Sequence, residues 1–209
     1  MFLLLGPLLN FVSGFFWEPD SQGITGGTLA ALACACWLVG LIGLYDRLRA
    51  AAPRYVAVAM PLTVFAAVGG VAFGVQSIHE GLFDASHAST IELLDQHPLA
   101  AWSLYWLAGP LFPLALFALG VALLKLRAAP VPVGVLLCLG ALAFPLSRIT
   151  REPMIAHVAD LLLLLPFLYL GVRALTGADR PERSSPASRA GLDYPVTTSA
   201  GGSTVTGAP

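Results

Sequence analysis

Six apolar segments, separated by short stretches that hold most of the charged residues, run through the first 175 residues of the chain. A helix needs about 20 apolar residues, and at least about 17, to cross a bilayer. Only helices and closed barrels satisfy every backbone polar group in lipid, and runs of this length favour helices. The segments cover Met1 to Phe16, Gly26 to Leu44, Tyr55 to Ile78, Leu99 to Leu124, Pro132 to Leu146 and Pro153 to Leu175. The sequence predicts an all-α, polytopic membrane bundle of about six transmembrane helices.

Composition supports this prediction and excludes other classes of protein. Hydrophobic residues make up 57% of the chain, charged residues make up 11%, and the mean hydropathy is +0.79. A soluble domain carries about 25% charged residues, so this chain cannot cover a water-facing surface. The net charge of -1 provides no general attraction for nucleic acid. We expect a protein of the cell membrane whose partners are membrane lipids and a lipophilic small molecule, while the oligomeric state is not predicted.

Residue usage also points to a source and argues against metal or redox chemistry. Lys125 is the only lysine and Asn10 the only asparagine, which is typical of a gene rich in G and C from a bacterium. The three cysteines fall inside apolar runs, without the spacing of a zinc or disulfide site. We therefore predict no metal site.

Basic residues between the segments predict the orientation. Nine lie on one side, which are Arg47, Arg49, Arg54, Lys125, Arg127, Arg173, Arg180, Arg183 and Arg189, against Arg148 and Arg151 on the other. Cytoplasmic loops carry the excess of Lys and Arg, so both termini are expected in the cytoplasm. From residue 176 onward the chain is rich in Gly, Ser, Thr, Pro and Ala. Such a composition predicts a transmembrane domain over 1–175 and a disordered cytoplasmic tail over 176–209.

Two features of the segments predict irregular structure. Gly109 and Pro110 interrupt the fourth segment, and the fifth is short and ends near Pro145. A bilayer tolerates such breaks where neighbouring helices or a cavity satisfy the freed backbone groups, so kinked helices beside a cavity are expected. Residues 84–96, between the third and fourth segments, are expected to form a loop on the outer side.

Asp160 is the most informative residue for function. It lies about 10 Å along the sixth segment, counted from Pro153, and five leucines follow it. A carboxyl group at this depth costs about 2–3 kcal/mol on insertion scales, so it should face the bundle interior or a wet cavity. His157 lies three residues earlier on the same helix face. The two readings left open are a polar contact that holds helices together and a functional acid or ion site.

Other polar candidates gather at the same predicted outer side. Gln76 and Glu80 share one face of the third segment, and His79 borders it. This group is either a proton-accepting cluster or an ordinary solvated helix end.

Aromatic and basic candidates follow farther along the chain. Trp102, Tyr105 and Trp106 share a face of the fourth segment and form either an interfacial belt or the lining of a substrate cavity. Arg148 either forms a structural ion pair or binds an anionic group of the substrate.

Two families resemble this pattern. The chain's size, its small bundle, and the isolated carboxyl groups of Glu80 and Asp160 near one face resemble the integral membrane terpene cyclases, which use acidic residues to direct carbocation cyclisation. The segment Ile78-His79-Glu80-Gly81 resembles the emopamil-binding sterol isomerases, which place His and Glu on a membrane helix near an aromatic cavity. Both resemblances imply a helical membrane enzyme acting on a lipophilic substrate.

The leading interpretation is therefore a membrane enzyme that cyclises or isomerises a prenylated or other lipophilic substrate by acid initiation. Asp160 would hold and donate a proton, and Glu80 or His79 would accept one at termination. The three aromatic residues of the fourth segment would shield the cation, and no cofactor is needed.

Two alternatives from other classes remain. One is a proton-coupled small-molecule carrier in which Asp160 and His157 relay protons. The other is a non-catalytic membrane accessory protein whose polar residues only pack helices.

Overall fold

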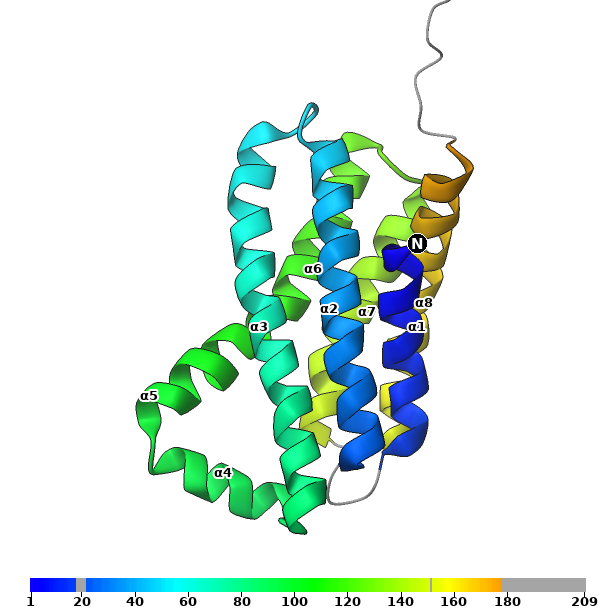
Figure 1. Ribbon diagram of the computed structural model, residues 1–209. Coiled ribbons are helices and arrows are strands. Elements are labelled where there is room, and N and C mark those ends of the chain that lie inside the picture. Colours follow the sequence, from blue (N-terminus) through cyan, green and yellow to red (C-terminus); the bar gives the residue numbers. More distant parts are fainter. Residues whose placement is uncertain (18–21, 151, 178–209) are drawn as a thin grey trace, which may run out of the picture. The chain divides into compact units, whose positions relative to one another are not determined.

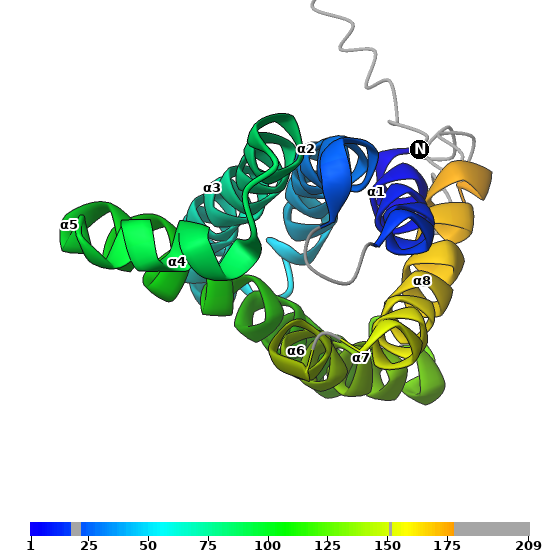
Figure 2. The same ribbon diagram turned by 90° about the horizontal axis from the view of Figure 1, so that it is seen from below.

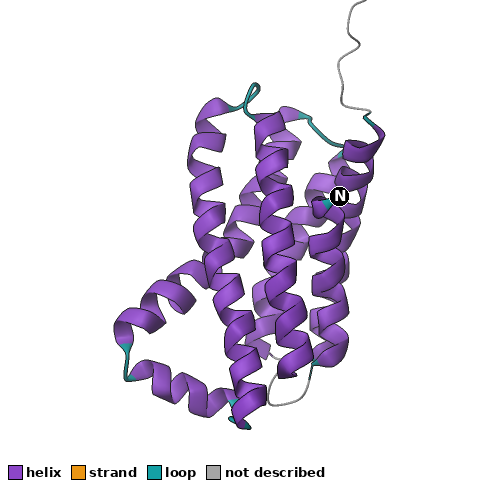
Figure 3. Cartoon of the chain, in the orientation of Figure 1, coloured by secondary structure: helices purple, strands orange, loops and turns teal. Residues whose placement is uncertain are grey.

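Every regular element that the structure describes is a helix (Figure 3). The structure is a computed structural model that describes residues 1–17, 22–150 and 152–177. The chain divides into a unit from Met1 to Ala178 and a unit from Asp179 to Pro209. The second unit, and with it most of the predicted tail, lies outside the described residues. For the first unit, the predicted helical membrane bundle is confirmed.

The predicted segments all appear as helices, with an additional helix between the third and the fourth (Figure 1). The order along the chain is α1 (Phe2–Ser13), the 3-10 turn η1 (Gly14–Phe16), α2 (Gly23–Leu48), α3 (Pro53–Phe83), α4 (His87–Asp95), α5 (Pro98–Ala100), the π-helix η2 (Ala101–Leu107), α6 (Ala108–Leu126), α7 (Val131–Thr150) and α8 (Pro153–Thr176). Proline at the first position begins α3, α5 and α8, where its missing N–H leaves no bond unmade.

Five of the predicted spans are long and apolar enough to cross a membrane as single runs, and the first is shorter. The α1 helix has 12 residues and η1 adds 3, which corresponds to a length of about 24 Å. A hydrocarbon core is about 30 Å thick, so α1 falls short of a full span.

The helices of the first unit form a closed ring. Consecutive members α1, α2, α3, α6, α7 and α8 pack side by side, and α8 returns to contact α1. Figure 2 shows these helices around a common interior, with α4 and α5 extending outward beside α3. The short α1 thus closes the ring between α2 and α8.

Small residues allow the helix backbones to approach closely, which is the main source of attraction between helices in lipid. A Cβ atom on Gly6 of α1 would lie 2.7 Å from the backbone nitrogen of Trp37 on α2. A Cβ atom on Gly27 of α2 would lie 2.6 Å from the carbonyl oxygen of Gly74 on α3. Both contacts are with backbone, so larger residues would force these helices apart.

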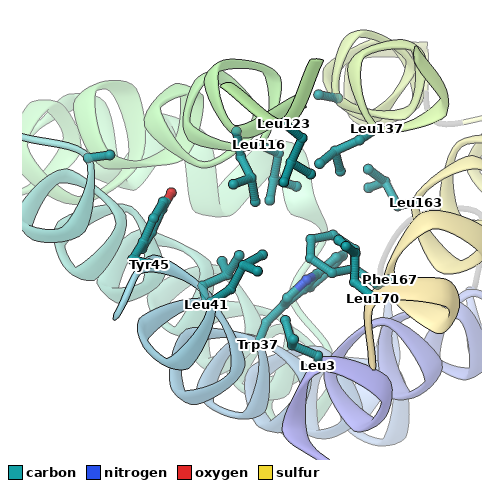
Figure 4. Close-up of a cluster of buried hydrophobic side chains, with 14 of the residues drawn as sticks. Leu3, Trp37, Leu41, Tyr45, Leu116, Leu123, Leu137, Leu163, Phe167 and Leu170 are labelled. Atoms are coloured by element: carbon teal, nitrogen blue, oxygen red, sulfur yellow. The ribbon is translucent and has the colours of Figure 1, made fainter. Parts of the chain in front are cut away.

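Large apolar side chains fill the ring from its middle towards the end where α2 meets α3. Trp37, Leu41, Leu116 and Phe167 are at most 1% exposed and come from three different helices. Figure 4 shows these side chains converging on the same interior, together with Tyr45 and Leu137. The Trp37 ring packs edge-on against Phe112 at 5.2 Å and against Phe167 at 5.3 Å. This part of the interior is a packed core.

Two predicted irregularities differ from the structure. The helix α7 continues through Pro145 to Thr150 and does not end near that proline. The predicted loop over 84–96 contains α4, because Asp84 ends α3 in the left-handed conformation with φ 51° and Ser86 then caps a new helix by accepting a bond from the Ser89 N–H. The α4 helix has only nine residues, and its large apolar residues are Ile91, Leu93 and Leu94, which is too short a pattern to distinguish a helix from a loop.

The predicted break near Gly109 and Pro110 takes the form of a π-helix just before them. Pro110 lacks an N–H for the carbonyl of Trp106, and its ring would clash with that carbonyl in a regular α-helix. The wider turn of η2, from Ala101 to Leu107, relieves the clash.

Candidate functional site

A cleft of about 800 Å³ opens at the end of the bundle where α1 ends, α2 begins and α3 ends. In Figure 1 this is the lower end of the ring, opposite the connection between α2 and α3. Its lining combines aromatic rings, two carboxyl groups and small residues. The lining residues are Phe15, Phe16, Trp17, Gln22, Gly23, Ile24, Thr25, Gly26, Glu80, Gly81, Asp84, Ala85 and Ser86.

Among the described residues, Glu80 is the one carboxyl group that both lines the cleft and is buried, with 3% of its surface exposed. Its Oε1 atom accepts a hydrogen bond from Gln76 Nε2 at 2.8 Å, one turn earlier on α3. The same atom lies 2.9 Å from His87 Nδ1, at the start of α4. We call Gln76, Glu80 and His87 the Glu80 cluster. Two hydrogen bonds hold one oxygen of Glu80 in place, while the carboxyl group remains at the cleft wall.

The histidine that contacts Glu80 is His87, whereas the sequence indicated His79 as the histidine that borders the Gln76 and Glu80 face. His79 lies on the exposed side of α3, where its ring packs near Phe83 at 6.0 Å. The left-handed Asp84 reverses the chain, with the Ala85 N–H donating to the Glu80 carbonyl oxygen at 2.9 Å. This reversal brings His87 back over Glu80, seven residues away. Asp84 and Ser86 are residue types that end and begin helices, and this pattern is the sequence signal that would have made His87 a candidate.

The aromatic residues of the fourth predicted span divide between two environments. Trp102 and Trp106 are 68% and 55% exposed, as residues of an interfacial belt are. Tyr105 is partly buried and lies within electrostatic range of Glu80. All three belong to the π-helix η2, and they do not line the cleft as a group.

Asp160 lies in a second buried polar contact, between α8 and α1. Its Oδ1 atom accepts a hydrogen bond from Asn10 Nδ2 at 2.7 Å, and the two residues are 2% and 5% exposed. We call these residues the Asp160 pair. Asn10 was missed as a site residue, although the only asparagine of the chain inside an apolar run is itself a signal, because polar groups in lipid need partners. Asp160 does not appear in the lining of the cleft.

His157 faces α1 from the same turn of α8. Its Nδ1 atom lies 2.6 Å from the Pro153 carbonyl oxygen, which can only accept, so Nδ1 carries a proton. Its ring packs edge-on against Phe15 at 4.6 Å. Gly14 fits between the two polar residues of α8, since a Cβ atom there would lie 3.4 Å from Asp160 Oδ2 and 3.9 Å from His157 Cε1.

Arg148 lies between two aromatic rings at the same end of the bundle. Its guanidinium carbon is 4.9 Å from the centre of the Trp17 ring and 4.8 Å from the centre of the Phe144 ring. It also lies within electrostatic range of Asp160. Arg148 therefore links the aromatic wall of the cleft, through Trp17, with the region of the Asp160 pair.

Three buried polar atoms near this end find no hydrogen-bond partner among the described residues. They are Trp17 Nε1, Gln22 Oε1 and Gln76 Oε1. Unpaired buried polar atoms are rare in folded proteins and call for a water or a ligand. Within the described residues, no group of three His, Cys, Asp or Glu side chains could hold a metal ion.

No family model matches the chain, and neither the curated proteins nor the solved structures contain a match to it. A fold alone does not determine an activity, so function has to be argued from the chemistry of the site.

Proposed function

We propose that the protein is an integral membrane enzyme that isomerises or cyclises a lipophilic substrate by proton transfer in the cleft beside Glu80. The observation that carries this proposal is the Glu80 carboxyl group, which is buried at the wall of an 800 Å³ cleft and hydrogen-bonded to a histidine. Small-molecule sites place a few convergent polar groups beside aromatic or apolar side chains, and this cleft places Glu80 beside the rings of Phe15 and Phe16 in a lining that is otherwise largely polar. The substrate class, prenylated or otherwise lipophilic, follows from the location in a membrane and the rings of Phe15 and Phe16.

The proposed reaction moves protons and consumes no other reactant. Protonated Glu80 gives its proton to one carbon of a double bond, whose electron pair forms the new C–H bond and leaves a cation on the neighbouring carbon. The cation then loses a proton from an adjacent carbon to the Glu80 carboxylate, or it first bonds to a second double bond and forms a ring. His87 Nδ1, 2.9 Å from Glu80, provides a route for protons between the carboxyl group and solvent.

The Asp160 pair has a supporting part in this proposal. The Asn10–Asp160 hydrogen bond ties α1 to α8, and the wall residues Phe15, Phe16 and Trp17 directly follow α1. The proton donor at the cleft is therefore assigned to Glu80 and not to Asp160, which the sequence had favoured.

The packed core favours the enzyme over a proton-coupled carrier. Trp37, Leu41, Leu116 and Phe167 fill the ring above the cleft, whereas a carrier needs a path to the other side of the membrane. In proteoliposomes, uptake of an unchanged substrate would favour the carrier.

The test uses membranes that contain the full-length protein in ²H₂O with a panel of prenylated substrates. Isomerisation and cyclisation preserve the mass, so a product is recognised by a changed chromatographic retention and by deuterium gained from solvent. We expect such a product with the wild type and with Glu92→Gln, which removes an exposed carboxylate on α4, but not with Glu80→Gln. A product without solvent deuterium, or full conversion by Glu80→Gln, would overturn the proposal.

A further inference from the structure

We infer that the cleft binds a lipophilic amine, with an ammonium head group at Glu80 and an apolar body along Phe15 and Phe16. This inference rests on the proposed function in taking the cleft as the substrate site, and it adds the charge and hydrogen-bonding character of the substrate. It comes from the side chains that line the cleft, most of whose polar groups attract positive charge or accept hydrogen bonds.

The charged side chains of the lining are both acidic. Glu80 is buried in the wall, and Asp84 lies exposed at the rim, one turn farther along the chain. Among the described residues of the lining there is no Lys, Arg or His. A carboxylate in a site partly shielded from water attracts a cation much more strongly than it would in bulk water. The lining thus favours a cationic ligand over an anionic one.

Two amide oxygens add unused hydrogen-bond acceptors. Gln22 lines the cleft and is 5% exposed, and its Oε1 atom has no partner among the described residues. Gln76 stands one turn before Glu80 on α3 and is not part of the lining, and its Oε1 atom likewise has no partner among the described residues. The orientation of the Gln76 amide is fixed, because only its nitrogen can donate to the Glu80 carboxylate. An ammonium group, which has several N–H donors and no acceptor, complements this arrangement.

The aromatic residues suit both parts of such a ligand. Phe15 and Phe16 are 62% and 45% exposed and line the cleft, so their rings are available to an apolar body and to a cation. Trp17 contributes one donor, Nε1, which has no partner among the described residues and suits an oxygen atom next to the amine.

Two basic groups near the cleft are compatible with a bound cation. Arg148 stacks over the Trp17 ring with its guanidinium carbon 4.9 Å from the ring centre, and it is not part of the lining of the cleft. His87 bonds to Glu80 through Nδ1, and in its neutral form it donates this hydrogen bond and leaves the carboxylate charged while the ammonium group binds. For the proposed reaction the ammonium group then transfers its proton to the Glu80 carboxylate, which leaves a neutral amine beside the protonated carboxyl group that protonates the double bond.

The test compares three probes that share one alkyl chain and differ only in the head group: N,N-dimethyldodecylamine, dodecanol and dodecanoate. The full-length protein in nanodiscs of zwitterionic lipid is titrated with each probe, and empty nanodiscs are subtracted. Isothermal titration gives the affinities, and tryptophan fluorescence provides a second signal because Trp17 lines the cleft. We expect the amine to bind about tenfold or more tightly than the alcohol, and the carboxylate to bind most weakly.

Variants locate this preference in the cleft. Glu80→Gln should remove the preference for the amine, whereas Glu92→Gln on α4 should keep it. Asp84→Asn should weaken amine binding by less than Glu80→Gln does, and Asn tolerates the left-handed backbone at this position. This rim variant also keeps the inference testable if Glu80→Gln fails to fold. Equal binding of alcohol and amine by the wild type, or a preference that survives Glu80→Gln in a folded protein, would overturn the inference.

The binding test and the conversion test can fail independently of each other. A product that contains solvent deuterium, without a preference for the amine in binding, would contradict this inference and still support the proposed function. Selective amine binding without any conversion would leave the binding site standing and sink the proposed function.

Discussion

The two ends of the helix ring bury polar side chains of different kinds. At the end where α2 meets α3, Tyr45 and Thr63 form a hydrogen bond between hydroxyl groups at 3.0 Å, and both are at most 1% exposed. At the cleft end, the Glu80 cluster and the Asp160 pair bury carboxyl groups that are 3% and 2% exposed. One end therefore buries hydroxyl groups, and the other buries carboxyl groups together with their amide partners.

This difference distinguishes buried polar groups that hold helices together from buried polar groups that mark a functional site. Two hydroxyl groups satisfy each other, and such a bond between membrane helices is worth about 0.6 kcal/mol on average. A carboxyl group in the membrane is more expensive to bury, and it usually marks a site of chemistry or transport. The cleft lies at the end with the carboxyl groups, which is the arrangement expected if that end is functional.

The largest expected effect is on substrate conversion, which a substitution at the cleft end should lower and a substitution at the other end should not. Glu80→Gln keeps the size and most hydrogen bonds of the side chain but removes the transferable proton, so conversion should fall by about 10²-fold or more. Tyr45→Phe, at the end where α2 meets α3, should leave conversion within about twofold, because it alters no group near the cleft. Both variants are measured in the same membranes by chromatography of lipid extracts. Equal losses in the two variants would erase the functional difference between the ends.

Asp160 tests whether every carboxyl group at the cleft end is functional. Asp160→Leu leaves the Asn10 amide buried without its partner, which should lower the stability of the fold by about 1–3 kcal/mol. Asp160→Asn keeps the shape and an acceptor oxygen, so it should fold normally and retain conversion within about tenfold. Thermal unfolding in detergent and the conversion assay report the two effects. A folded Asp160→Asn variant without conversion would make Asp160 the acid, as its position in the sequence first indicated.

The two ends of α2 provide a matched pair of glycine substitutions. Gly27→Ala, near the cleft, would place a Cβ atom 2.6 Å from the Gly74 carbonyl oxygen and should cost about 1–3 kcal/mol of stability. Gly43→Ala meets nothing within 4 Å and should be neutral or stabilise the helix by up to about 1 kcal/mol. Melting temperatures in detergent compare the variants. Similar values would mean that the crossing of α2 and α3 near the cleft is not tight.

The smallest expected effect is on stability and concerns the hydrogen bond between Tyr45 and Thr63. Tyr45→Phe leaves Thr63 without its hydroxyl partner and should lower the free energy of unfolding by about 0.6 kcal/mol, and by less than 2 kcal/mol. A double-mutant cycle with Thr63→Val measures the pair directly. A coupling larger than that of Asn10 with Asp160 would contradict the ranking of the two ends.

The length of the apolar runs was sufficient to predict the helices of the ring, although not α4, because lipid demands long runs without charge. The same rule identified Glu80 and Asp160, whose carboxyl groups stand out in such runs. The pairing partners were harder to predict. Asn10 and Asp160 are separated by 150 residues, and only the closure of the ring by α1 brings them together.

His87 illustrates a different limit of prediction. Its contact with Glu80 depends on one left-handed residue, Asp84, which turns an expected loop into a helix. Aspartate adopts this conformation more readily than most residues, but the sequence does not determine that it does so here. The position of α1 was equally hard to predict, because its packing against α2 and α8 depends on the arrangement of the whole ring.

The π-helix η2 sets the rotation of α4 and α5, which extend outward beside α3, relative to the ring helix α6. A π-turn accommodates one more residue than an α-turn, and each residue of an α-helix turns the chain by about 100°. Deleting Trp106 or Leu107 would restore an α-helix and rotate the residues before the deletion, Tyr105 included, by that angle relative to α6. Tyr105 would then leave the side of Glu80, and α4, which carries His87, would be pulled from its place over α3. A one-residue deletion outside the cleft would thus disconnect the histidine from the carboxyl group.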